Sequence, residues 1–172
     1  MDRTQLAAVQ APLKARYRED PGAALVTLTA EGSLGAEGIA CSVATARAVV
    51  DAGLHPASGG TGALACSGDM LLQALVACAG VTLRAVATAL DFDVAGTVHA
   101  EGDLDFRGTL GVAKDEGVPV GFRAIRLRFA LEHSLDDEQL ATLLRLTERY
   151  CVLYQTLVGG APVAVTVESG GS

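Results

Sequence analysis

Residues 66–90, CSGDMLLQALVACAGVTLRAVATAL, decide how this chain folds. Ser67 can offer its hydroxyl to an orphan amide at a helix start, Asp69 puts a negative charge in the first turn, and no proline follows before Leu90. The stretch therefore predicts one helix of about six turns. Because it is apolar nearly all round and rich in alanine, we expect it at the centre of the protein, with sheets or a partner subunit wrapped around it.

The composition limits the class of protein. With 172 residues, the chain is long enough to form one domain spanning 1–172. Half of the residues are apolar but only 4% are aromatic, so the core is built from small side chains that need large contact areas, which favours oligomerisation. The net charge of -7 disfavours nucleic acid and anionic membranes as partners, because both attract a basic surface.

The sequence gives no indication of export or of a membrane span. The first ten residues, MDRTQLAAVQ, lack the apolar region of a signal peptide. Gln73 and Arg84 interrupt the central helix, so we expect it not to cross a membrane. Cysteines in such a chain are typically thiols rather than a disulfide framework. We therefore expect a soluble, cytoplasmic protein.

The segments around the central helix predict an α+β fold. Residues 1–20 form a helical extension that Pro12 kinks, and residues 54–65 form a glycine-rich loop. Alternating or β-branched patterns predict strands at 24–34, from Ile39 onward, at 94–107, at 125–131 and at 163–167. The SLDD motif, with Ser134 and Asp137 as a capping box, starts a helix that runs on to a Gly-Gly stop at 159–160.

Charged residues alternate with apolar ones on two of these strands. If strands 94–107 and 125–131 pair, Glu101 and Asp103 lie opposite Arg128 and Arg126. We interpret this ladder as a solvated face of a sheet rather than a binding site.

The chemistry of this chain must be sought in its four cysteines, Cys41, Cys66, Cys78 and Cys151. They form neither a CxxC motif nor a zinc cluster, and the chain lacks a P-loop, a GxGxxG and a GxSxG, so we expect no metal or cofactor. On the residues alone, each cysteine is either a small core side chain or a redox thiol. Cys66, at a helix start, is an inert loop residue or an alternative partner for Cys78. His55 is a loop residue, or else a base or ligand.

Two motifs together identify a family. SGDMLLQALVACAGVTL at 67–83, followed by LTERYCVLYQTL at 146–157, resembles the osmotically inducible protein C and organic hydroperoxide resistance (OsmC/Ohr) family. The resemblance implies antiparallel sheets wrapped around the two central helices of an intertwined homodimer. It also implies a thiol-dependent peroxidase, in which Cys78 is the peroxidatic and Cys151 the resolving cysteine. A dithiol such as dihydrolipoamide then reduces the Cys78–Cys151 disulfide.

The resemblance further implies an arginine that activates the thiol, held by a glutamate ten residues before the peroxidatic cysteine. This chain has Gly68 at that place, and Asp69 is the nearest carboxylate. Asp69 either substitutes as the holder or is a first-turn charge favoured by the helix dipole. Three residues are candidates for the arginine: Arg16, Arg18 and Arg47.

An apolar cleft beside Cys78 would admit a hydrophobic hydroperoxide, and four residues are candidates to line it: Leu75, Val81, Tyr150 and Tyr154. Two other functions fit the same features. The cleft can hold a hydrophobic small molecule while the thiols stay passive. Alternatively, the altered charge pair at Gly68 suits a thiol enzyme of the same fold that acts on a different electrophile.

Overall fold

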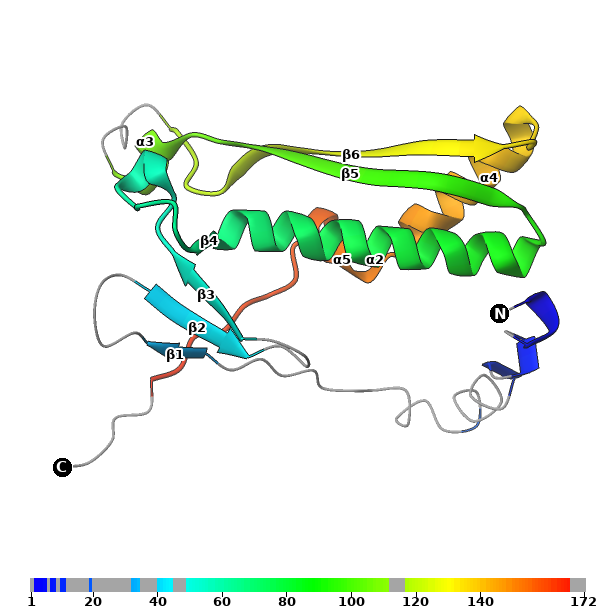
Figure 1. Ribbon diagram of the computed structural model, residues 1–172, viewed down its shortest axis with the longest axis horizontal. Coiled ribbons are helices and arrows are strands. Elements are labelled where there is room, and N and C mark those ends of the chain that lie inside the picture. The colour runs from blue at the N-terminus through cyan, green and yellow to red at the C-terminus, as the bar shows by residue number, and fades with distance from the viewer. Residues whose placement is uncertain are drawn as a thin grey trace.

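The computed structural model describes residues 2–5, 7–8, 10–11, 19, 32–34, 40–44, 49–111 and 117–167. The fold is α+β, and its centre is the helix α2 (Ser67–Leu90), as the sequence predicts. A long two-stranded ribbon, β5 (Val94–Leu104) and β6 (Phe122–His133), lies along α2 on one side (Figure 1). The helices α4 (Asp137–Tyr150) and α5 (Val152–Gly159) also pack on α2.

The start of α2 is fixed by a strand rather than by a side chain. Cys66 is the N-cap, with φ -81° and ψ 133°, and makes no capping hydrogen bond through its side chain. Pairing with Gly53 holds Cys66 in this extended conformation, so the helix begins at Ser67, one residue earlier than a Ser67 cap requires. The predicted cap is therefore wrong, although Asp69 does lie in the first turn.

A small sheet precedes the helix, with the order β1 (Gly32–Leu34), β2 (Ala40–Ala44), β3 (Val49–Gly53) and β4 (Ala65–Cys66). β1 and β2 pair antiparallel, as the antiparallel sheets implied by the family resemblance require, and residues 24–31 lie outside the described ones. The β3–β4 pair is parallel, which departs from the expected antiparallel sheets. The glycine-rich loop between them contains a short helix, η2 (Pro56–Ser58).

The β5–β6 ribbon has the expected alternation but a different register. Glu101 lies opposite Arg126, and Arg128 lies opposite His99, so the predicted pairing is shifted by two residues. Arg126 still donates to Asp103 on the diagonal, at 2.7 Å, on the exposed face. The strand ends at Leu104 rather than at 107, because Asp105 accepts a hydrogen bond from the Arg107 amide and starts the short helix α3 (Phe106–Thr109).

The predicted single helix after β6 is two helices. The predicted capping box is displaced: Asp136 accepts from the Gln139 amide at 2.8 Å, and the Gln139 side chain accepts from the Asp136 amide at 3.1 Å. The His133 ring nitrogen accepts from the Leu135 amide, and Leu135 packs against the core, so the helix cannot begin at Ser134. Cys151, with φ -73° and ψ 108°, ends α4 and precedes α5.

The structure agrees with the helix predicted near the N-terminus but not with the strand predicted near the C-terminus. The described residues among 3–11 are helical, and Asp2 and Gln5 form a capping box; the kink at Pro12 lies outside them. The predicted last strand is wrong, since residues 161–167 form none and three valines there are 86–88% exposed: Val163, Val165 and Val167. A strand needs a neighbouring edge, and none pairs with this segment in the described part of the protomer.

The core lies at the C-terminal end of α2. Leu83, Val86 and Ala87 pack there with Val94 of β5 and Leu143 of α4. On another side of α2 Ala77, Val81 and Ala85 are exposed, so within one chain the helix is not buried on most sides; covering of this side by a partner subunit stays a prediction.

The length and hydropathy of α2 also meet the criteria for a membrane span, despite Gln73 and Arg84. Its most apolar 18-residue window has a mean hydropathy of 1.8 and is 28% buried within the described residues. The core helix of a soluble protein meets the same criteria.

Candidate active site

Cys78 and Cys151 come together in the structure. Cys78 lies in the middle of α2 and is half-buried, whereas Cys151, at the break between α4 and α5, is only 1% exposed. Both are free thiols, and the Cys151 thiol donates a hydrogen bond to the Cys78 sulfur. The two sulfurs are thus in contact without a bond between them.

Because the chain breaks at Cys151, α5 begins next to Cys78 and its first backbone amides face the Cys78 sulfur. The first amides of a helix have no intrahelical acceptor and carry its positive end. The amides of Val152 and Leu153 donate to the Cys78 sulfur, and the Thr82 hydroxyl, one turn along α2, also interacts with it. In the structure the single hydroxyl proton of Thr82 is donated to the Cys78 carbonyl oxygen, at 2.8 Å.

These contacts give the two thiols opposite acidities. Burial raises the pKa of Cys78, but the hydrogen bonds from Leu153, Cys151, Val152 and Thr82 outweigh it, so the pKa lies below its ordinary value. Burial raises the pKa of Cys151, and the neighbouring Cys78 raises it further, against the opposing effect of the Tyr154 amide. Cys78 is therefore the more acidic thiol of the pair, and Cys151 the less acidic one.

A set of hydrogen bonds holds the break in place. The Cys151 amide donates to the Thr147 carbonyl at 2.9 Å, and the Cys151 carbonyl accepts from the Gln155 amide at 2.9 Å. The Gln155 side chain reaches back over the break and donates to the Glu148 carbonyl at 2.9 Å. Gln155 therefore links the last turn of α4 to the first turn of α5, which fixes the direction of the α5 amides.

The other predicted site residues lie apart from this pair. Asp69 is exposed, and nine residues of helix place it about 13 Å along the axis from Cys78. Cys66 is about 18 Å away by the same measure, so the structure does not bring it to Cys78. Cys41 lies in β2, with its backbone opposite Leu34, and the role of its thiol stays a prediction. The candidate cations Arg16, Arg18 and Arg47 lie outside the described residues.

His55 has a structural role in its loop. Its ring nitrogen Nδ1 accepts from the Ala57 amide at 3.0 Å, and its ring stacks on Phe106 with centroids 4.8 Å apart. Among the described residues, no group of three His, Cys, Asp or Glu side chains is arranged to hold a metal ion.

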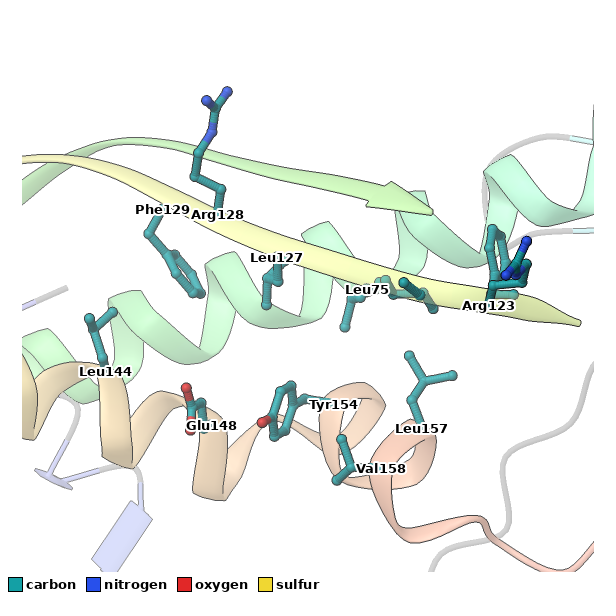
Figure 2. A pocket seen from close by; sticks show the side chains of 13 residues that line it. Leu75, Arg123, Leu127, Arg128, Phe129, Leu144, Glu148, Tyr154, Leu157 and Val158 are labelled. Carbon is teal, nitrogen blue, oxygen red and sulfur yellow. The ribbon is translucent and has the colours of Figure 1, made fainter. Parts of the chain in front are cut away.

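A cavity of about 820 Å³ lies between β6 and the helices α4 and α5 (Figure 2). Its volume is within the range of about 300–1,000 Å³ that is usual for small-molecule sites. Leu75, one turn before Cys78, and Tyr154, one turn after Cys151, both line it, as predicted. The other two predicted lining residues do not; Val81 is 72% and Tyr150 58% exposed.

Several of these features could not be predicted from residue types. No glycine or proline marks the break at Cys151. Its neighbours Tyr150 and Val152 are compatible with a continuous helix, so the sequence pattern predicts no break there. The α5 amides that contact Cys78 belong to the backbone, which is the same in all residues but proline, so the residue types do not predict this contact. From the sequence, Thr82 and Gln155 are indistinguishable from other polar residues on a helix surface.

A helix-borne thiol, a buried partner thiol at a helix break and a long antiparallel ribbon define an α+β class of proteins with paired cysteines. The chain belongs to the family of OsmC-like proteins, whose family model matches residues 60–167. That match includes both cysteines, the whole of α2 and the β5–β6 ribbon.

Solved structures of OsmC-like proteins have the same fold. An OsmC-like protein from Mycoplasma pneumoniae superposes with a TM-score of 0.63 at 16% identity, over 78% of this chain and 89% of that one. An OsmC-like protein of unknown function from Vibrio cholerae O1 biovar eltor gives a TM-score of 0.56 at 12% identity, over 77% and 94%. No curated protein matches the chain significantly.

Proposed function

We propose that this protein is a thiol-dependent peroxidase that reduces organic hydroperoxides. The observation that carries the proposal is the contact between Cys78 and the buried Cys151 at the start of α5. One thiol of the pair is favoured as a thiolate, and the second lies in reach of it. An attacking thiolate with a resolving thiol beside it is what a two-cysteine peroxidase requires.

The reaction proceeds in two steps. The Cys78 thiolate attacks the terminal oxygen of the hydroperoxide; an S–O bond forms, the O–O bond breaks, and the leaving alkoxide takes a proton to become an alcohol. Cys78 is now a sulfenic acid, oxidised by two electrons. The Cys151 sulfur then attacks the Cys78 sulfur, an S–S bond forms, and the hydroxyl leaves as water with the proton from Cys151. A dithiol such as dihydrolipoamide returns the two electrons by exchange.

The active form we propose is an intertwined homodimer in the cytoplasm. The exposed side of α2 carries Ala77, Val81 and Ala85, small apolar side chains that let a second helix approach closely. A second copy would cover this side, as the family resemblance implies. Asp69, remote from Cys78 within one chain, then either holds an arginine of the dimer or serves only the helix dipole.

The test is mass spectrometry of the reduced protein after one equivalent of cumene hydroperoxide, with hydrogen peroxide as comparison. We expect a rapid Cys78–Cys151 disulfide, formed preferentially with the organic peroxide. Cys151→Ser should stop at a Cys78 sulfenic acid, and Cys78→Ser should leave Cys151 reduced. Cys66→Ser is the matched control and should still form the disulfide. If both thiols of the wild type stay reduced over minutes, the peroxidase proposal is wrong.

A second candidate function rests on the cavity. Its volume and apolar lining suit a binding protein for hydrophobic small molecules in which the thiols take no part. Slow thiol oxidation together with thermal stabilisation by such ligands would favour this function. Rapid alkylation of Cys78 without peroxide turnover would instead favour a thiol enzyme that acts on another electrophile.

A further inference from the structure

The cavity between β6 and the helices α4 and α5 is lined by neither Cys78 nor Cys151, and it has one charged side chain on its helix wall. Apolar side chains of β6, α4 and α5 form most of the lining, among them Leu127, Phe129 and Leu144. Glu148 lies on the opposite wall from β6, next to Tyr154 (Figure 2). Its carboxylate has no ion-pair partner among the described residues.

The two arginines of the lining do not offset this charge. Arg128 extends from β6 away from the cavity, so it contributes its backbone and stem to the wall (Figure 2). Arg123 lies further along β6 from Glu148, and its guanidinium is 3.6 Å from the Asp105 carboxylate. Among the side chains that line the cavity, the charge on the α4 wall is therefore negative.

We propose that the cavity takes uncharged apolar molecules and that Glu148 discriminates against anionic amphiphiles of the same size. A bound ligand displaces water from the cavity, which lowers the screening between its own charge and Glu148. An ester or alkyl hydroperoxide makes the apolar contacts without this repulsion, whereas a free fatty acid brings a second carboxylate. The substrate class rests on the proposed peroxidase function, but the discrimination by charge is a property of the cavity.

The experiment compares molecules that differ only in charge. Binding of decanoate and of methyl decanoate is measured by displacement of a fluorescent apolar probe, on the full chain with Cys78→Ser to keep the thiol silent. We expect the ester to bind about fivefold more tightly, because Glu148 is exposed in the free protein and a like-charge pair at such a site costs about 1 kcal/mol. Glu148→Gln should remove most of this preference. Glu132→Gln, an equal charge change at an exposed residue outside the cavity, should retain it.

Turnover provides the second readout. With wild-type protein, kcat/KM for the hydroperoxide of methyl linoleate should exceed that for linoleic acid hydroperoxide, and Glu148→Gln should bring the ratio close to one. Equal or tighter binding of the acid, or failure of both ligands to bind, overturns this inference; tighter binding that Arg123→Gln abolishes would assign the head group to Arg123. An ester preference in binding with no turnover of either hydroperoxide would remove the peroxidase proposal alone.

Discussion

Val152 is one of the residues that lower the pKa of Cys78, and it acts through its backbone amide. As the first residue of α5 it donates its amide to the Cys78 sulfur, and proline is tolerated at this position because a first-turn amide has no helical acceptor. Cys151 already has the extended conformation that a following proline requires. Val152→Pro therefore removes one donor to the thiolate with little effect on the helix.

We expect Val152→Pro to raise the pKa of Cys78. Only the thiolate reacts with iodoacetamide, so the pH at which the alkylation rate reaches half its maximum should move upward. Val152→Ala keeps the amide and should leave the profile in place. An unchanged profile in the proline variant would mean that the amide of Leu153 and the side-chain donors suffice.

Leu143 is the residue whose truncation should cost most stability. It is fully buried and joins α4 to the core at the end of α2. Leu143→Ala should lower the free energy of unfolding by about 2–5 kcal/mol, through lost burial and the cavity left behind. Leu110→Ala, at a residue that is 55% exposed, should cost under about 1 kcal/mol in the same urea titration.

At the scale of elements, the start of α4 has two aspartates, of which one caps the helix by a hydrogen bond and the other contributes only its charge. Asp136 and Asp137 both place a negative charge at the helix start, but only Asp136 accepts the Gln139 amide. Asp136→Ala should destabilise the protein by about 1 kcal/mol, and Asp137→Ala by less, since it loses only the interaction with the dipole. Equal losses in thermal unfolding would show that the charge alone matters.

The elements that the sequence predicts well are those with a sustained period. The apolar run of α2 and the alternation of β5 and β6 extend over many residues, so tertiary contacts do not alter their type. Register and breaks are less predictable. The connection between Leu104 and Phe122 is too long in the sequence to be a tight hairpin turn that would set the pairing, and Cys151 breaks its helix without a breaker residue.

At the scale of the whole molecule, the exposed side of α2 predicts a self-association surface. Val81 is 72% exposed in the middle of this side. Val81→Asp should convert the proposed dimer to a monomer in light scattering coupled to gel filtration, because a buried unpaired carboxylate is costly. Val120→Asp, at a residue that is 66% exposed and far from α2 in the sequence, should leave the dimer intact.

The candidate site was predictable only in part, because it combines two kinds of information. The pairing of Cys78 with Cys151 came from the family resemblance, since spacing on two separate helices does not reveal a contact. Leu75 and Tyr154 followed from their places one turn from each cysteine. The place of the activating amides depends on how α5 is turned, and the place of Glu148 in the cavity on how α4 is turned; only the packed structure specifies either.

The contact between Cys78 and Cys151 also has a consequence for the entropy of the unfolded chain. A bond between them closes a loop of roughly 70 residues, and such a crosslink stabilises a folded protein by about 4 kcal/mol in the chain-entropy model. In each catalytic cycle the protein would therefore alternate between a reduced form without this crosslink and an oxidised form that has it. Resistance to unfolding would then record the oxidation state of the protein, independently of any ligand.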